Sequence, residues 1–138
     1  MKTKLIFFGN QQDSLEGTKR GAIAFLTLII LDNIWFKIMD YSDVVTKKPI
    51  NIKSALLVWL LLCSAIGVQD RPTSYKEAGL YGMLVGLVTY GVYNGTNYAI
   101  LKNWTPKVAI LDTLWGMFVC SMASLSVYYF YHKKMKSG

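Results

Sequence analysis

The chain has little of what enzymes and metal proteins are built from. Its 138 residues include one histidine and two cysteines, and the cysteines lie far apart, at positions 63 and 120. GxSxG, HExxH and phosphate-loop motifs are all missing. We therefore expect no catalytic residues, no metal site and no cofactor. Both cysteines fall inside apolar runs, which indicates two buried thiols rather than a disulfide.

Charge is also scarce. Charged residues make up 17% of the chain and hydrophobic residues 53%, whereas soluble domains have more charge and fewer apolar residues. The apolar residues gather in runs that approach the roughly 20 residues needed to cross a bilayer. The sequence therefore predicts an integral membrane protein, with the lipid bilayer as its first partner.

The charge that is present has an excess of +7. Lysines lie in short loops and near both ends of the chain, where they would meet anionic lipid headgroups. No basic stripe with interleaved aromatic residues lies on a soluble helix, so we expect no nucleic-acid partner.

A signal peptide is not apparent, because the apolar stretch 5–8 is too short and no small-residue cleavage site follows it. We expect residues 1–20 to form a polar, basic arm and residues 132–138 a basic tail. Between them, residues 21–131 form one domain of four membrane-spanning helices, expected at about 21–39, 52–68, 77–101 and 108–131.

The helix limits follow from local signals. Pro49 and Pro106 end loops, and Ser74 followed by Glu77 is typical of a capping box at a helix start. The expected fold is an all-α four-helix membrane bundle with both termini on the same side. Nine basic residues on that side against six on the other favour the cytoplasmic side for the termini.

Small residues recur at helical spacing in the third and fourth spans. Close backbone approach through such residues drives helix association in lipid, where hydrophobic attraction between helices is weak. We expect two GxxxG pairs on the third span and one glycine on the fourth to pack the helices together. These residues are Gly82, Gly86, Gly91, Gly95 and Gly116.

Polar residues interrupt the apolar runs at a common depth. Counting 1.5 Å per residue from the helix ends, Asp32 and Asn94 lie about 10 Å deep, and Asn97 and Asp112 about 6 Å deep, in the same half of the bilayer. A buried acid is costly unless it is paired, hydrogen-bonded or hydrated. We expect both acids to face the third span and to hydrogen-bond its amides or tyrosines. The tyrosines concerned are Tyr90 and Tyr93.

Two interpretations of this polar cluster compete. It is either a clasp that fixes which helices meet, or a proton or ion site. The clasp is favoured because a chain of 138 residues has little volume for an alternating-access path. Segments 31–35 and 111–115 share the pattern LD-x-[IL]-W on helices of opposite direction, as in inverted-repeat transporters, but five residues do not distinguish a repeat from chance.

Several motifs resemble a known family. They are Tyr90-Gly91-x-Tyr93-Asn94-x-Thr96-Asn97-x-Ala99, Asn103-Trp104, Asp112-x-x-Trp115-Gly116 and, in the first span, Leu31-Asp32-x-x-Trp35. Together they resemble the signature of the predicted membrane proteins grouped as domain of unknown function 2177, over most of residues 21–131. The chain departs from that signature at Gly95, where leucine is expected, and at Asn94, where aspartate is at least as usual.

The resemblance implies four spans, no established activity, and an occurrence in bacteria and large DNA viruses. It marks Trp35, Trp104 and Trp115 as motif or interfacial aromatic residues. We therefore expect a non-enzymatic structural or interaction component of a membrane-associated assembly, in its concrete form a virion inner-membrane protein in contact with capsid proteins. The alternatives are a small transporter or ion-conducting oligomer that uses Asp32 and Asp112, and, less favoured, a membrane enzyme.

Overall fold

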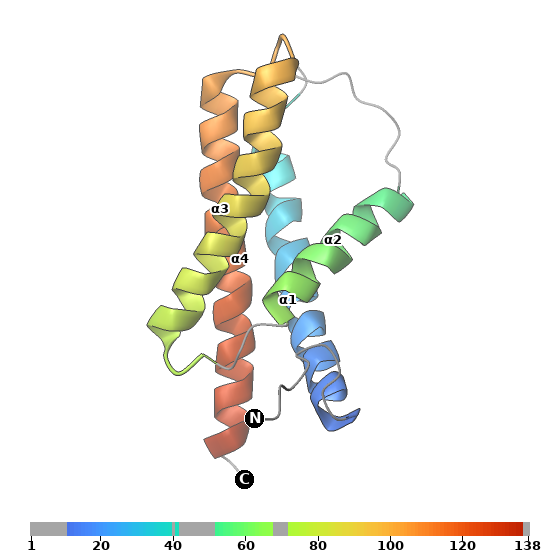
Figure 1. Ribbon diagram of the computed structural model, residues 1–138, viewed down its shortest axis with the longest axis vertical. Coiled ribbons are helices and arrows are strands. Elements are labelled where there is room, and N and C mark those ends of the chain that lie inside the picture. The colour runs from blue at the N-terminus through green and yellow to red at the C-terminus, as the bar shows by residue number, and fades with distance from the viewer. Residues whose placement is uncertain (1–10, 40, 42–51, 68–71, 137–138) are drawn as a thin grey trace, which may run out of the picture.

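The computed structural model describes residues 11–39, 41, 52–67 and 72–136, which form four α-helices (Figure 1). These helices are α1 (Gln11–Ile38), α2 (Ile52–Gly67), α3 (Tyr75–Ile100) and α4 (Pro106–Lys136). No strand occurs in these ranges. α3 and α4 form an antiparallel hairpin, and α1 begins at the end of the bundle where α4 ends, here called the basal end (Figure 1). The predicted all-α bundle is confirmed.

Two helices extend further than expected at the basal end. α1 begins ten residues before the predicted span, so the second half of the expected arm 1–20 is helical, and α4 continues to Lys136 through most of the expected tail 132–138. The reason is local, because glutamine, glutamate, lysine and arginine favour helix and no proline interrupts either segment. Residues 1–10 and 137–138 lie outside the described part of the chain.

Two of the helices contain a segment long and apolar enough to cross a membrane, Leu15–Ile38 in α1 and Pro106–Tyr131 in α4. α2 is apolar but has only 16 residues, which is roughly 24 Å of helix against a hydrocarbon core of about 30 Å. α3 has 26 residues, but its glycine, asparagine, threonine and tyrosine residues lower its hydropathy. Four helices are present, but only α1 and α4 combine the length and the composition expected of all four spans.

α3 and α4 approach each other through glycine. A Cβ atom added at Gly82 would lie within 3.0 Å of the Cys120 carbonyl oxygen, and one added at Gly86 within 3.0 Å of the Gly116 carbonyl oxygen. Gly116 in turn leaves room for the ring of Tyr90, which would lie within 3.0 Å of a Cβ at that position. These three glycines therefore pack the hairpin backbone to backbone, as the sequence pattern indicates.

The second glycine pair on α3 has no such role, which corrects the expectation for it. A Cβ at Gly91 would make only an ordinary 3.8 Å contact with Thr113, and one at Gly95 would meet nothing within 4 Å. Five residues separate Gly86 from Gly91, and five steps of 100° place the second pair roughly 140° around the helix from the first. The second pair therefore lies off the line of closest approach between α3 and α4.

A different set of glycines joins α1 to α2. A Cβ at Gly67 would lie 3.5 Å from the carbonyl oxygen of Gly17 and from the amide nitrogen of Gly21. Gly17 and Gly21 are themselves a GxxxG pair, but the first of them falls in the segment expected to be a polar arm. The contact anchors the C-terminal end of α2 near the start of α1.

The core is narrow and runs along the line where α1, α2 and α4 meet. Its residues are mostly small or aliphatic, and both cysteines are among them as buried free thiols, as predicted. The core residues are Ala24, Leu28, Leu62, Cys63, Ile66, Val119, Cys120, Ala123 and Val127.

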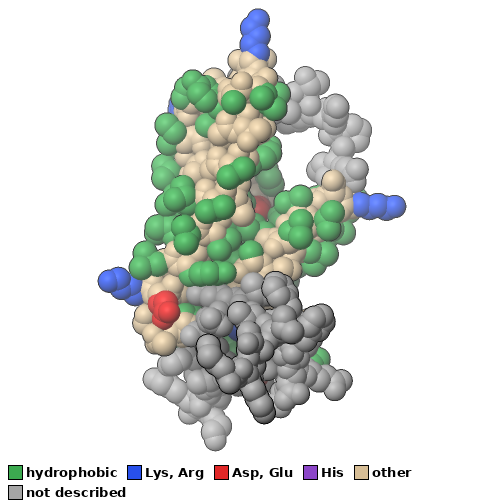
Figure 2. All heavy atoms as spheres, viewed as in Figure 1, with side chains coloured by type: hydrophobic (Ala, Val, Ile, Leu, Met, Phe, Trp, Pro, Cys, Tyr) green, Lys and Arg blue, Asp and Glu red, His purple; other side chains and the backbone are tan. Residues whose placement is uncertain are grey.

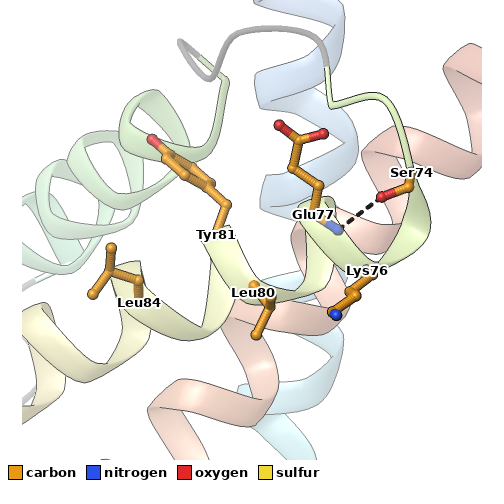
Figure 3. A pocket seen from close by; sticks show the side chains of 6 residues that line it. All are labelled: Ser74, Lys76, Glu77, Leu80, Tyr81 and Leu84. Carbon is orange, nitrogen blue, oxygen red and sulfur yellow. Dashed lines mark hydrogen bonds between the residues drawn. The ribbon is translucent and has the colours of Figure 1, made fainter.

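α3 begins with the predicted capping box (Figure 3). The Ser74 hydroxyl accepts a hydrogen bond from the Glu77 amide at 3.1 Å. The Glu77 carboxylate accepts hydrogen bonds from the amide and the hydroxyl of Thr73, both at 2.7 Å. Two otherwise unpaired backbone donors are satisfied in this way, and the helix start is fixed.

The outer surface of the helices is apolar. Figure 2 shows hydrophobic side chains over the exposed faces of α2 and α3, with lysines at their ends. Leu61 on α2 and Val92 on α3 are 64% and 66% exposed. A surface of this kind fits contact with lipid rather than with water.

Candidate functional site

The two acids of the predicted polar cluster are buried in one layer of the bundle. Asp32 lies in the C-terminal half of α1 and Asp112 in the second turn of α4, and their side chains are 4% and 8% exposed. α1 and α4 run in opposite directions (Figure 1), so these positions come to the same level. The rings of Trp35 and Trp115 stack between the two helices, with centroids 4.6 Å apart and planes within 5°.

Asp112 is held by three donors. Its Oδ1 accepts hydrogen bonds from the Tyr41 hydroxyl at 2.7 Å and from Trp35 Nε1 at 3.2 Å. Its Oδ2 accepts one from Asn94 Nδ2 at 2.7 Å. Tyr41 lies beyond the end of α1, and burial followed by the Asp112 carboxylate raises the pKa of its phenol well above the ordinary value. Tyr41 therefore remains a donor at any physiological pH.

Asp32 is held by two indoles. Its Oδ1 accepts a hydrogen bond from Trp115 Nε1 at 3.1 Å, and its Oδ2 one from Trp59 Nε1 at 3.3 Å. Trp59 belongs to α2, so this carboxylate joins α1 to both α2 and α4. The expectation that Asp32 bonds to amides or tyrosines of α3 was wrong, because the side chain points toward α2 and α4 instead.

The two LD-x-[IL]-W segments bond to each other reciprocally. Asp32 of the first accepts from Trp115 of the second, and Asp112 of the second accepts from Trp35 of the first. Within each segment the acid and the tryptophan are three residues apart and so lie on one helix face. With α1 and α4 antiparallel, the same face of each meets its counterpart, and the stacked indoles lie between the two acids. We call this arrangement the reciprocal clasp.

Asn94 connects the reciprocal clasp to α3. Its side chain is 1% exposed, its Nδ2 donates to Asp112 and to the Tyr90 carbonyl oxygen, and its Oδ1 accepts from Trp104 Nε1 at 3.2 Å. Trp104 lies in the α3–α4 turn and is 5% exposed, so it belongs to the network rather than to an interfacial belt. The chain has four tryptophans, and each donates its indole N–H to Asp32, Asp112 or Asn94.

The remaining members of the predicted cluster lie at its margin. Tyr90 packs on Gly116, and Tyr93 is 56% exposed with its ring edge-on to Trp104 at 5.9 Å. Asn97 is half-buried, and within the described residues no side-chain hydrogen bond joins it to either acid.

Two network residues were not anticipated. Trp59 sits in the most apolar run of the chain, and Tyr41 follows the first span in a polar loop. Their side-chain chemistry, rather than their position in a pattern, could have indicated them. A buried indole or phenol generally finds a hydrogen-bond acceptor, and Asp32 and Asp112 are such acceptors.

The network is a chain of fixed neutral donors around two acceptors. Indole and amide groups do not titrate in the physiological range. In the described part of the chain, no group of three histidine, cysteine or acidic side chains is placed to hold a metal ion. What this arrangement does chemically is hold α1, α2, α3 and α4 in one register, because each helix contributes at least one member.

A bundle of apolar helices around a buried polar network is typical of small polytopic membrane proteins. The family described as predicted membrane protein (DUF2177) matches residues 19–129. The chain belongs to this family, which confirms the resemblance seen in the sequence motifs and supports a membrane location. No curated protein and no solved structure shows significant similarity to the chain.

Proposed function

We propose that the protein is a non-enzymatic membrane protein that serves as a structural and interaction component of a membrane-associated assembly. The observation that carries this proposal is the basal end, where helix continues beyond the apolar spans. In the sequence, the polar residues 11–14 precede the apolar run of α1 and the basic stretch 132–136 follows that of α4, and the helices include both stretches, since they run from Gln11 to Lys136. Both extensions lie on the same side of the bundle.

The two helices are joined to each other next to these extensions. The Tyr131 hydroxyl donates to the Glu16 carbonyl oxygen at 2.8 Å, and the Arg20 guanidinium lies over the Tyr131 ring at 5.5 Å. The sequence here is basic, with Lys19 and Arg20 on α1 and three lysines at the end of α4. A joined, basic pair of helix ends at the membrane surface is suited to contact an acidic face of another protein.

The concrete form of the proposal is a virion inner-membrane protein in contact with the capsid layer. Two observations support it. The family resemblance implies that such proteins occur in bacteria and large DNA viruses, and the basal ends of α1 and α4 together form a basic surface, here called the basic platform. In a bacterial membrane the same platform would face a cytoplasmic protein.

The test is purification of the full chain in a mild detergent, followed by identification of co-purifying proteins. We expect a partner that is lost when the three basal lysines Lys133, Lys134 and Lys136 are replaced by alanine. Replacement of Lys102 and Lys107, at the opposite end of the bundle, is the control and should leave the partner bound. A protein that purifies alone, or that loses its partner equally in both variants, would contradict the proposal.

One observation favours a second candidate, a proton- or ion-conducting oligomer, because Asp32 and Asp112 are two acids buried in one layer. Proton flux into liposomes separates the two candidates. Flux that wild-type protein supports and Asp32→Asn abolishes would establish conduction, whereas equal, background-level flux in both would favour the structural function.

A further inference from the structure

The N-terminal part of α3 lines a hollow that has a charged end and an apolar end. It has a volume of about 470 Å³ and is lined by Ser74, Lys76, Glu77, Leu80, Tyr81 and Leu84 (Figure 3). Lys76, Leu80 and Leu84 follow one another at four-residue intervals and so form a stripe along one side of the helix. Leu80 and Leu84 are 53% and 57% exposed, so this stripe is open to whatever surrounds the bundle.

The charged end of the stripe is a cation without a competing acid. Glu77 is next to Lys76 in sequence, but its carboxylate is held by the two hydrogen bonds from Thr73. Figure 3 shows the Glu77 carboxylate and the Lys76 ammonium on different sides of α3. Within the described residues, no carboxylate forms an ion pair with Lys76. Glu77 and Lys76 together leave the hollow without net charge, but the charge at the end of the stripe of Leu80 and Leu84 is the Lys76 ammonium.

Aromatic residues next to Lys76 indicate its depth in the bilayer. The Tyr75 and Tyr128 rings meet edge to face at 4.7 Å, and the Tyr128 hydroxyl donates to the Thr73 carbonyl oxygen at 3.3 Å. Tyrosines of this kind collect at the headgroup level of a bilayer. Lys76 adjoins this pair, which places its ammonium among the headgroups.

The apolar part of the stripe has the length of one leaflet. Below Leu84 the stripe continues to Val88, which is 55% exposed. The twelve helical steps from Lys76 to Val88 span roughly 18 Å, and half of a 30 Å hydrocarbon core is about 15 Å. A chain anchored at Lys76 would thus lie on apolar side chains down to the bilayer midplane.

We propose that this hollow binds one anionic phospholipid, with its phosphate headgroup on Lys76 and an acyl chain along Leu80 and Leu84. The site is on the basal side of the bundle, where the basic residues of α1 and α4 also gather. It depends on the membrane location of the protein but not on the assembly role proposed above, and it includes no residue of the reciprocal clasp.

Native mass spectrometry of the full chain in detergent tests the site. Phosphatidylglycerol and phosphatidylcholine with identical acyl chains are titrated separately, and retained lipid is counted. We expect tighter retention of phosphatidylglycerol, weakened about fivefold by Lys76→Ala, which corresponds to about 1 kcal/mol for one lysine at an anionic surface. Leu80→Asn combined with Leu84→Asn should weaken retention of phosphatidylglycerol even with Lys76 in place.

Lys102→Ala is the matched control, because it removes the same charge from the opposite end of α3 and should leave retention unchanged. All variants are first compared in thermal unfolding without added lipid, and Lys76→Ala is expected to unfold as wild type does because Lys76 is exposed. Equal retention of the two lipids by wild-type protein would overturn the proposal. So would an equal loss of phosphatidylglycerol in Lys76→Ala and Lys102→Ala.

Discussion

Two glycines on the same helix should respond in opposite ways to the same one-carbon substitution. Gly86→Ala adds a methyl group within 3.0 Å of the Gly116 backbone, whereas Gly95→Ala adds one with nothing within 4 Å. The atoms that oppose Gly86 are backbone, so no side chain can rotate away and α3 must separate from α4. Overpacking costs about 1–3 kcal/mol, and the rigid opposing surface puts Gly86→Ala near 3 kcal/mol.

Gly95→Ala carries no such penalty and gains up to about 1 kcal/mol from the better helix propensity of alanine. The free energies of unfolding of the two variants should therefore differ by about 3 kcal/mol or more. Unfolding in mixed micelles by stepwise addition of a denaturing detergent, followed by tryptophan fluorescence, measures this difference. Gly67→Ala lies between them, because its methyl would stand 3.5 Å from α1 in ordinary contact. If Gly86→Ala unfolded like Gly95→Ala, the backbone contact of α3 with α4 would not exist as described.

Three further predictions concern the polar network. Asp112→Ala removes the acceptor of three hydrogen bonds, and Asp32→Ala removes the acceptor of two longer ones. Each such bond contributes about 0.6–1.7 kcal/mol in membrane proteins. In the same unfolding assay, Asp112→Ala should therefore lose about 2–5 kcal/mol of stability and Asp32→Ala about 1–3 kcal/mol. Asn97→Ala should change stability by less than about 0.5 kcal/mol, as substitutions away from packed features usually do, and a larger loss would show that it belongs to the network. Trp115→Phe keeps the ring stack with Trp35 but removes the bond to Asp32, so in a double-mutant cycle it should couple to Asp32→Ala and not to Asp112→Ala.

Much of this fold follows from counting along the sequence. Apolar runs and prolines predicted four helices, and the rise per residue predicted that Asp32 and Asp112 would lie in the same half of the bilayer. In the structure the two acids belong to one hydrogen-bonded layer of the bundle. Gly82 and Gly86 were recognisable as a packing pair. Axial position is predictable because each residue adds a constant 1.5 Å.

Rotation about the helix axis was harder to predict, because an error of one residue turns a side chain by about 100°. Gly91 and Gly95 have the same spacing as the first glycine pair, but a Cβ at Gly91 would make only an ordinary contact with Thr113 of α4 and one at Gly95 would make none within 4 Å. Asp32 was expected to face α3, but it turns toward α2 and α4. Trp59 could not be distinguished by pattern, since a tryptophan in an apolar run has no polar neighbour that indicates which way its N–H points.

The reciprocal clasp explains why the two LD-x-[IL]-W segments are alike. When two antiparallel helices cross, a local two-fold axis relates them, and any residue of one that contacts the other is contacted in return by its equivalent. An acid and a tryptophan one turn apart then suffice, because each acid meets the tryptophan of the opposite helix and the two rings stack at the axis. The arrangement satisfies two buried acids and two buried indoles without a cation. Asymmetry enters only through the outer donors, since α2 supplies Trp59 to Asp32, whereas α3 and the segment after α1 supply Asn94 and Tyr41 to Asp112. The similarity of the two segments is thus explained by the packing of α1 against α4, and it requires neither transport nor an inverted repeat of whole helices.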